Sequence, residues 1–188
     1  MAPKKTTSKQ TVYQLKITLK GIRPPIWRRV QLDSKTKLQD LHMIIQEAMG
    51  WDNYHLHSFT IGGYEYGQAG DDFDVRSENN VKLSDVVAGE KSKFFYTYDF
   101  GDDWEHEIIV EKELPAAPDA FYPLCMKGKR ACPPEDCGGS WGYTELLEIM
   151  ADPEHPEYEE KMEWFDSDFD PEVFDIDDVN DCLQSLFG

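Results

Sequence analysis

The sequence feature that most constrains the fold is a hairpin pattern over residues 94–110. Apolar or aromatic residues alternate with polar ones on both sides of a Gly-Asp-Asp turn at residues 101–103. Successive side chains of a strand point to opposite faces of a sheet, so this alternation predicts two antiparallel strands with one shared apolar face. The residues of that face are Phe94, Tyr96, Tyr98, Phe100, Trp104, His106, Ile108 and Val110. The chain must therefore build a sheet around this hairpin and cover its aromatic face.

Two strands and a helix are predicted before the hairpin. Residues 13–19 alternate between apolar and polar side chains, and residues 26–32 follow them after a turn of glycine and proline, which indicates two paired strands. Thr36 and Gln39 have the spacing of a capping box, and apolar residues then recur on one helical face. Gly50 is placed to end this helix.

The segment between this helix and the hairpin is mixed. Residues 55–61 alternate again before a Gly-Gly pair, which predicts a strand with His55 and His57 on one face. Residues 64–80 are rich in Gly, Asp and Asn and are expected to form a long loop, followed by a helical turn at residues 83–87.

The order of these elements predicts the α+β class. We expect a β-grasp-like roll over residues 12–114, in which one helix lies across a mostly antiparallel sheet. Residues 1–11 are expected to be a flexible basic tail. Residues 115–188 are expected to form a linker, a Cys/Pro/Gly loop at 125–142 and an acidic appendage of three short helices, packed on the core.

The charge of the chain is unevenly distributed. The 188 residues include 37 acids and 19 bases, for a net charge of −18, but residues 1–50 hold 10 bases and 3 acids. A net negative charge of this size repels the phosphate backbone of nucleic acids. A protein or a small molecule is therefore a more suitable partner than a nucleic acid. The basic first third is expected to hold the sheet against the acidic carboxyl-terminal helices.

The sequence predicts a cytoplasmic protein. No apolar run approaches the roughly 18 residues of a membrane span, and the first ten residues do not resemble a secretion signal. In a reducing compartment the four cysteines are expected to be free or metal-bound rather than disulfide-bonded.

Three histidines and nearby acids form the first candidate site. His55, His57 and His106 lie on predicted strands, and the hairpin turn adds carboxylates at Asp99, Asp102 and Asp103. If neighbouring strands bring them together, imidazoles and a carboxylate would suit Zn²⁺ or Fe²⁺ with open positions for water or substrate. The alternative is that these histidines are hydrogen-bonded core residues.

A cluster of thiols forms the second candidate site. Cys125, Cys132 and Cys137 lie within 13 positions and could hold a structural Zn²⁺ with His155 or Cys182 as fourth ligand. Paired C-x2-C knuckles are absent, so the alternative is a rigid, packed loop. Cys182 is expected to be a buried thiol on the apolar face of the last helix.

A third candidate is a basic patch of Arg23, Trp27, Arg28 and Arg29. Arginines interleaved with an aromatic residue can grip phosphate or stack on a base. Alternatively, these arginines pair with the surplus carboxylates of the molecule itself.

Several segments together resemble one known family. They include Ile22-Arg23-Pro24-Pro25-Ile26-Trp27-Arg28-Arg29, Gly50-Trp51, His55-Leu56-His57-Ser58-Phe59, Tyr98-Asp99-Phe100-Gly101-Asp102-Asp103-Trp104-Glu105-His106, residues 132–139 and residues 169–171. The family is that of the plasmid Ri open-reading-frame-three-like proteins, some of which are labelled passenger TnpR-like proteins of insertion elements. The resemblance spans residues 12–186 and implies no established activity.

The expected function is a non-enzymatic binding or adaptor module, because no complete catalytic signature or phosphate-cradling glycine loop is present. One alternative is a metal-assisted hydrolase that uses the His/Asp site. Another is a nucleic-acid-associated accessory protein of a mobile element. Recombinase activity is not expected, since a resolvase needs a serine nucleophile among arginines and a basic DNA-binding region.

Overall fold

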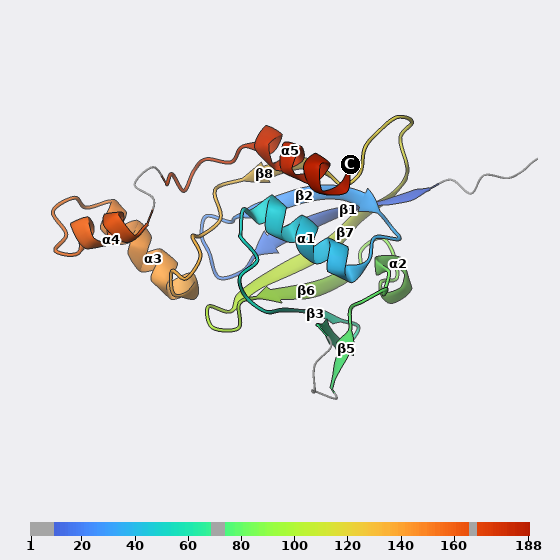
Figure 1. The fold of residues 1–188 in the computed structure, drawn as a ribbon, viewed down its shortest axis with the longest axis horizontal. Coiled ribbons are helices and arrows are strands. Elements are labelled where there is room, and N and C mark those ends of the chain that lie inside the picture. Colours follow the sequence, from blue (N-terminus) through green and yellow to red (C-terminus); the bar gives the residue numbers. More distant parts are fainter. Residues whose placement is uncertain (1–9, 69–73, 166–168) are drawn as a thin grey trace, which may run out of the picture.

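The aromatic hairpin lies in the middle of a large twisted sheet (Figure 1). In a computed structural model that describes residues 10–68, 74–165 and 169–188, eight strands follow the order β5-β4-β3-β6-β7-β1-β2-β8. The strands are β1 (Thr11–Leu19), β2 (Trp27–Asp33), β3 (His57–Ile61), β4 (Tyr64–Gly67), β5 (Val75–Ser77), β6 (Lys93–Tyr98), β7 (Trp104–Pro115) and β8 (Leu124–Lys129). All neighbours are antiparallel except β4 and β5. The predicted α+β class is confirmed, and its β-grasp-like detail stays a prediction.

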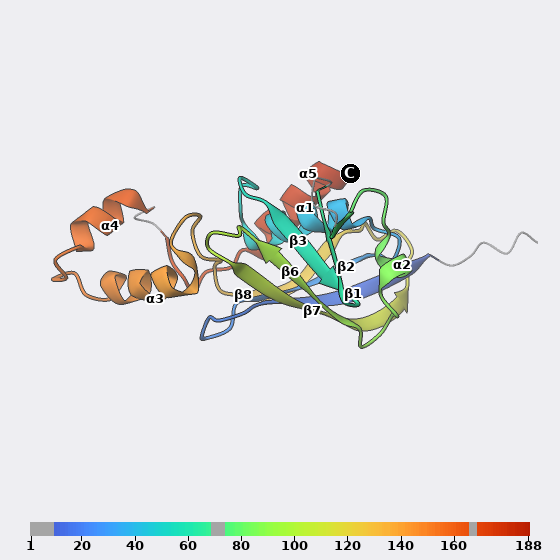
Figure 2. The ribbon, with the colours of Figure 1, turned by 90° about the horizontal axis from the view of Figure 1, so that it is seen from below.

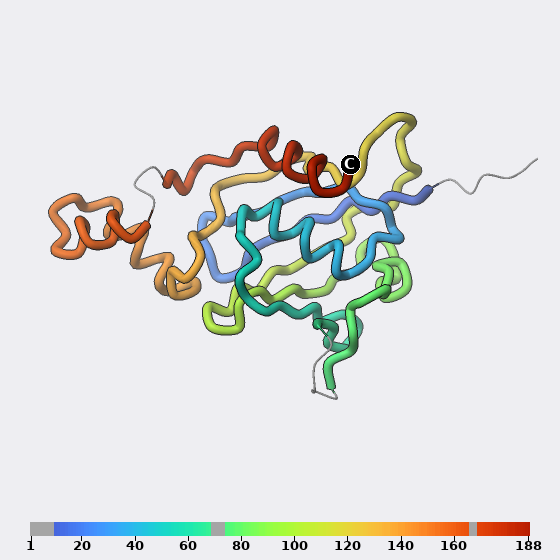
Figure 3. The backbone as a smooth tube through the Cα atoms, in the orientation of Figure 1, coloured from blue at the N-terminus to red at the C-terminus, as the bar shows by residue number. Residues whose placement is uncertain are grey.

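Two of the helices cover one face of the sheet. The helices are α1 (Leu38–Met49), α2 (Leu83–Val86), α3 (Gly139–Met150), α4 (Tyr158–Trp164) and α5 (Ile176–Phe187). Seen from below, α1 and α5 lie on the same side of the sheet (Figure 2). The trace of α3 and α4 leaves the body at one end (Figure 3). The opposite face of the sheet carries no helix in the part of the chain shown as ribbon.

The core lies between α1 and the sheet. Leu15 and Ile17 of β1 and Leu41 and Ile45 of α1 are buried, as is Trp104 at the start of β7. Burying one such aliphatic side chain contributes about 1.5–3 kcal/mol. This layer aligns the ends of β3, β6 and β7, and the loops at those ends carry the candidate site.

The start of α1 differs from the prediction. The helix begins at Leu38 with Lys37 as its N-cap, and no side chain caps it, so the capping box expected at Thr36 and Gln39 is not formed. The backbone carbonyl of Thr36 instead accepts a hydrogen bond from the Leu83 N–H. This bond ties the segment before α1 to the start of α2. Gly50 ends the helix in the left-handed conformation, as predicted.

Two segments expected to be loops contain strands. Gly62 and Gly63 both have positive φ, so they form a tight two-residue turn that returns the chain as β4. Residues 64–67 form β4 after this turn, and residues 75–77 form β5 beside it. Residues 69–73 lie outside the described residues. Similarly, Cys125 lies on β8, which pairs with β2 although its own residues barely alternate.

The last third of the chain contributes to the body. β8 completes the sheet, and the Asn180 side chain of α5 exchanges two hydrogen bonds with the Cys125 backbone. Cys182 is exposed on α5, so the prediction of a buried thiol there was wrong. Of the expected flexible tail, residues 1–9 lie outside the described residues and Thr11 already belongs to β1. Over the described ranges, no helix is long and apolar enough to cross a membrane.

Candidate functional site

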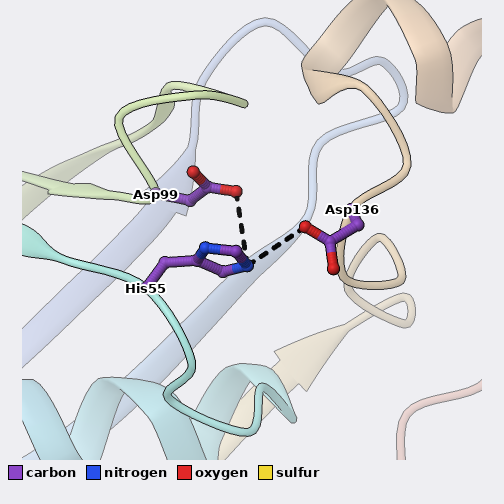
Figure 4. Close-up of side chains that lie close together, drawn as sticks. All are labelled: His55, Asp99 and Asp136. Atoms are coloured by element: carbon purple, nitrogen blue, oxygen red, sulfur yellow. Dashed lines mark ion pairs between the residues drawn. The ribbon is translucent and has the colours of Figure 1, made fainter.

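One histidine and two aspartates converge where three loops meet (Figure 4). His55 precedes β3, Asp99 follows β6, and Asp136 lies between β8 and α3. The His55 Nε2 atom lies 3.1 Å from Asp136 Oδ1 and 3.7 Å from Asp99 Oδ2. One potential ligand atom from each of the three residues lies within 4.8 Å of the others.

Glu135 brings a third carboxylate to the same place. Its Oε2 atom is 3.9 Å from His55 Nε2. Both of these atoms are buried and neither has a hydrogen-bond partner, because even the 3.1 Å contact of His55 with Asp136 lacks hydrogen-bond geometry. Two orphaned polar atoms that face each other are costly unless something else satisfies them.

The Tyr98 hydroxyl holds two of these loops together. It accepts hydrogen bonds from the backbone N–H groups of Tyr54, at 3.0 Å, and His55, at 3.4 Å, and donates to Glu135 Oε1 at 3.0 Å. Burial and the hydrogen bond to Glu135 raise the pKa of this phenol, so it stays protonated and able to donate. Tyr98 therefore positions both the His55 loop and the Glu135 carboxylate.

The backbone of the site loops is unusual. Asn53, Asp99 and Asp136 all have φ between 55° and 59°, a left-handed conformation that Asn and Asp tolerate better than other non-glycine residues. The Asp99 N–H donates to Leu56 O at 2.9 Å, and Asp99 Oδ1 accepts from the Gly101 N–H at 2.8 Å. These bonds aim the second carboxylate oxygen of Asp99 at His55.

The charge at the site is unbalanced. In residues 10–68, 74–165 and 169–188, no lysine or arginine forms an ion pair with Asp99, Glu135 or Asp136. The Asp99 and Glu135 side chains are only 10% and 17% exposed, so water screens them incompletely. Three carboxylates beside one imidazole form a set suited to a divalent cation.

The ligand spacing is close to what such an ion requires. Metal–ligand distances of about 2.0–2.2 Å place neighbouring donors about 3–3.5 Å apart. The distances of 3.1 and 3.7 Å from His55 Nε2 to its two aspartates lie near this range. His55 and the three carboxylates could therefore hold a metal after small side-chain rotations.

The structure separates the three histidines predicted to act together. The strand begins at His57, not at His55, so the alternation rule that placed both on one face does not apply. His57 is buried, stacks on His42 with ring centroids 3.5 Å apart, and contacts Glu78 at 2.9 Å. His106 is fully buried beside Tyr96. Burial lowers the pKa of His106 to about 4, as expected for a neutral core residue.

The turn acids divide in the same way. Asp99 lies beside His55, whereas Asp102 Oδ2 accepts a hydrogen bond from the Gly138 N–H at 3.1 Å. Asp103 is exposed, and its carboxylate is not part of the cluster. Asp102 thus anchors the loop that carries Glu135 and Asp136.

The clustered thiols form no comparable ligand set over the described ranges. Cys125 and Cys132 are buried and Cys137 is half-buried. Burial is the main cause that raises the pKa of the Cys132 and Cys137 thiols, the latter to about 12. Burial thus favours the protonated form of both thiols at neutral pH.

The predicted basic patch is split between the two faces of the sheet. Arg28 is buried on the helix side, where its guanidinium donates to the carbonyls of Ala48, Trp27 and Lys129. Trp27 and Arg29 lie on the open side, and Arg29 pairs with Glu111. Arg23 is exposed in the turn before β2.

Sequence reasoning missed Glu135 and Asp136. They lie inside the Cys/Pro/Gly loop, where no strand or helix periodicity indicates a direction for their side chains. The Pro-Pro-Glu-Asp run before Cys137 is the one signal that could have drawn attention to them.

Residues 138–142 also read Gly-Gly-Ser-Trp-Gly, which fits the G-x-S-x-G pattern of a nucleophile elbow. Ser140 lies in the first turn of α3. Over the described ranges, no histidine hydrogen-bonds to its hydroxyl. The motif therefore carries no catalytic triad here.

Comparisons with known proteins identify a family and two similar proteins. The family model of the plasmid pRiA4b ORF-3-like proteins matches residues 11–178. The chain is 37% identical to the uncharacterized protein y4hQ of Sinorhizobium fredii over 183 residues, covering 94% of this chain and 92% of that protein. It also resembles the crystal structure of MM3350, a protein of unknown function from Methanosarcina mazei Go1. That match has a TM-score of 0.82 and 44% identity and covers 90% of this chain and 98% of that one. The chain thus belongs to the family of plasmid pRiA4b ORF-3-like proteins.

Proposed function

We propose that this protein binds a divalent metal ion through His55, Asp99 and Asp136, with Glu135 as a fourth donor. The observation that supports this proposal is the pair of buried, unpartnered atoms, His55 Nε2 and Glu135 Oε2, at the point where the carboxylates converge. An ion between them would satisfy both atoms and offset the carboxylate charge. One imidazole with carboxylates suits Zn²⁺, Mn²⁺ or Fe²⁺.

The bound ion would serve a binding module. Asp136 is 67% exposed, so the site is open to solvent on that side. An ion that takes six ligands, such as Mn²⁺, would keep two positions beyond the four protein donors for oxygen atoms of a small ligand. The loops that carry His55 and Asp99 also present Tyr54, Leu56 and Phe100, which are 75%, 59% and 55% exposed. These apolar side chains would contact the rest of such a ligand.

Metal titration of the purified protein tests this proposal. We expect about one Zn²⁺ or Mn²⁺ per chain by calorimetry and elemental analysis. His55→Gln and Asp136→Asn should each weaken binding at least as much as the roughly 10–100-fold that loss of an outer-shell partner costs. Asp103→Asn is the matched control for Asp136→Asn, because it removes the same charge from the turn that carries Asp99, at a residue outside the cluster.

Absence of stoichiometric metal in the wild-type protein would refute the proposal. Equal loss of affinity in Asp103→Asn would also contradict it, because the carboxylates would then act only through net charge.

A metal-assisted hydrolase is the second candidate for the same site. The solvent-facing side of Asp136 supports it, because a water bound to the ion there would have its pKa lowered toward 7. In this alternative His55, Asp99 and Asp136 alone would hold the ion, and Glu135, held by Tyr98, would accept the proton of that water instead of binding the metal. Metal-dependent turnover of p-nitrophenyl esters or phosphates that is lost in Asp136→Asn would identify a hydrolase. Metal binding without turnover would identify a binding module.

A further inference from the structure

The open face of the sheet is basic although the whole chain is acidic. Cross-strand partners lie on the same side of a sheet, and the register pairs Lys127 with Arg29, Arg29 with Lys16, and Trp27 with Lys129. We call this surface the basic face. Its residues are Lys16, Lys20, Trp27, Arg29, Lys91, Lys93, Lys112, Lys127 and Lys129.

Most of the positive charge on the basic face is unpaired. Three glutamates of β7 face the same side, and each is already in an ion pair, with Lys20, Lys93 and Arg29. Over residues 10–68, 74–165 and 169–188, the other five lysines of the face form no ion pair. A hollow of about 540 Å³ is lined by Arg29, Lys91 and Lys112 with Glu111 as its single acid.

An aromatic ring lies among these cations. The Trp27 ring centroid is 5.5 Å from Lys16 Nζ and 5.2 Å from Arg29 Cζ. A flat ring surrounded by ammonium and guanidinium groups fits a partner that offers carboxylates together with an apolar or aromatic side chain.

The chain itself carries a segment with that chemistry. Helices α3 and α4, residues 139–164, extend away from the sheet (Figures 1 and 2), and we call them the acidic arm. Residues 145–164 hold eight acids and one lysine. Trp141 and Trp164 of the arm are 88% and 79% exposed, more than isolated apolar side chains on a free surface require.

One face of α3 matches the basic face in chemistry and spacing. Trp141, Glu145 and Glu148 follow each other at helical intervals, so they form one exposed stripe. The two glutamates lie about 5–6 Å apart on the helix, and Lys127 and Lys129 lie about 6.6 Å apart on their strand. The stripe thus offers one aromatic residue and two carboxylates, and the basic face offers one aromatic residue and two ammonium groups at a similar spacing.

We propose that two copies of this chain associate by placing the acidic arm of each on the basic face of the other. In a dimer with a two-fold axis, the same arm-to-face contact forms twice, so the arm and the basic face of both copies are covered. A nucleic acid is a less suitable partner for the basic face, because the net charge of −18 repels its phosphates. The acidic arm offers both carboxylates and tryptophan side chains.

Charge reversal with complementation tests the proposal. In sedimentation velocity at low salt, the wild-type protein is expected to dimerise in the micromolar to millimolar range. The face variant Lys127→Glu/Lys129→Glu and the arm variant Glu145→Lys/Glu148→Lys should each raise the dissociation constant roughly tenfold or more. Mixing the two variants should restore a dimer, because each reversed arm then meets a reversed face.

The control for the face variant is Lys35→Glu/Lys82→Glu. It changes the net charge by the same amount, at exposed lysines that do not belong to the basic face. It should dimerise like the wild type. A wild-type protein that stays monomeric up to about 1 mM overturns the proposal, and this measurement requires no variant to fold. Variants that dimerise unchanged, or a face that binds single-stranded oligonucleotide without any dimer, overturn it as well.

Discussion

Replacing Tyr98 with phenylalanine isolates the role of one hydroxyl in the candidate site. The ring is fully buried, so Phe fills the same space and leaves no cavity. The change removes the hydrogen bonds to the Tyr54 and His55 N–H groups and to Glu135. A hydrogen bond to a charged group contributes about 1.5–3 kcal/mol and a neutral one about 0.5–1.5 kcal/mol. We expect the free energy of unfolding to fall by about 2–4 kcal/mol, since the three bonds share one atom and do not add fully.

The same variant should also bind metal less tightly. Tyr98 orients Glu135 and the His55 loop without being a ligand itself, and loss of such an outer partner costs roughly 10–100-fold in affinity. This corresponds to about 1.4–2.8 kcal/mol of binding free energy. Urea unfolding without metal and calorimetric titration with Zn²⁺ measure the two effects separately.

Tyr96→Phe is the matched control. Tyr96 is fully buried on the same face of β6, and its hydroxyl bonds to His42 and Gln46 rather than to the site. We expect this variant to lose stability while its Zn²⁺ affinity stays unchanged. Wild-type affinity in Tyr98→Phe, or an equal loss of affinity in both variants, would show that the Tyr98 hydroxyl does not position the metal donors.

Two further predictions concern the core and the loop that carries the site. Burial lowers the pKa of His42 and His106 from 6.5 to about 4. As the pH falls, these histidines therefore take up protons in the unfolded chain while they stay neutral in the folded chain. The free energy of unfolding should therefore drop by about 1.6 kcal/mol per histidine between pH 6.5 and 5; urea titrations that superimpose at the two pH values would contradict this. A Cβ at Gly142 would lie 1.9 Å from Cys137 O, so Gly142→Ala should destabilise the protein by about 1–3 kcal/mol or more. It should also weaken Zn²⁺ binding by displacing Asp136, whereas a variant with wild-type stability and affinity would show that this turn can relax.

The regular elements of the core were predictable because their patterns are local. The strand at Thr11–Leu19, the helix ending at Gly50 and the Tyr98–Trp104 hairpin each bury one face, which imposes a period of two or of about 3.6 on the sequence. Strands β4 and β8 escaped prediction because their buried and exposed residues do not alternate. They lie next to one edge of the sheet and at the other edge, and their pairing depends on their neighbours.

The candidate site was only partly predictable for the same reason. Asp99 follows a strand whose end the sequence marks clearly, and its meeting with His55 was anticipated. His57 differs from His55 by two positions, yet His57 lies in the core and His55 in a loop with its side chain 28% exposed, because β3 begins only at His57. Glu135 and Asp136 reach the site through a left-handed turn, and a turn of that kind sets side-chain direction by backbone torsion rather than by periodicity.

Local patterns in the sequence were thus enough to predict a sheet with an aromatic buried face and a helix across it, in an acidic chain with a basic first third. Only the tertiary structure decided which histidine meets the carboxylates, because that depends on how loops from three distant segments approach one another. It also decided that Arg28 is buried while Trp27 and Arg29 face outward, since a strand buried on one side sends neighbouring residues to opposite faces.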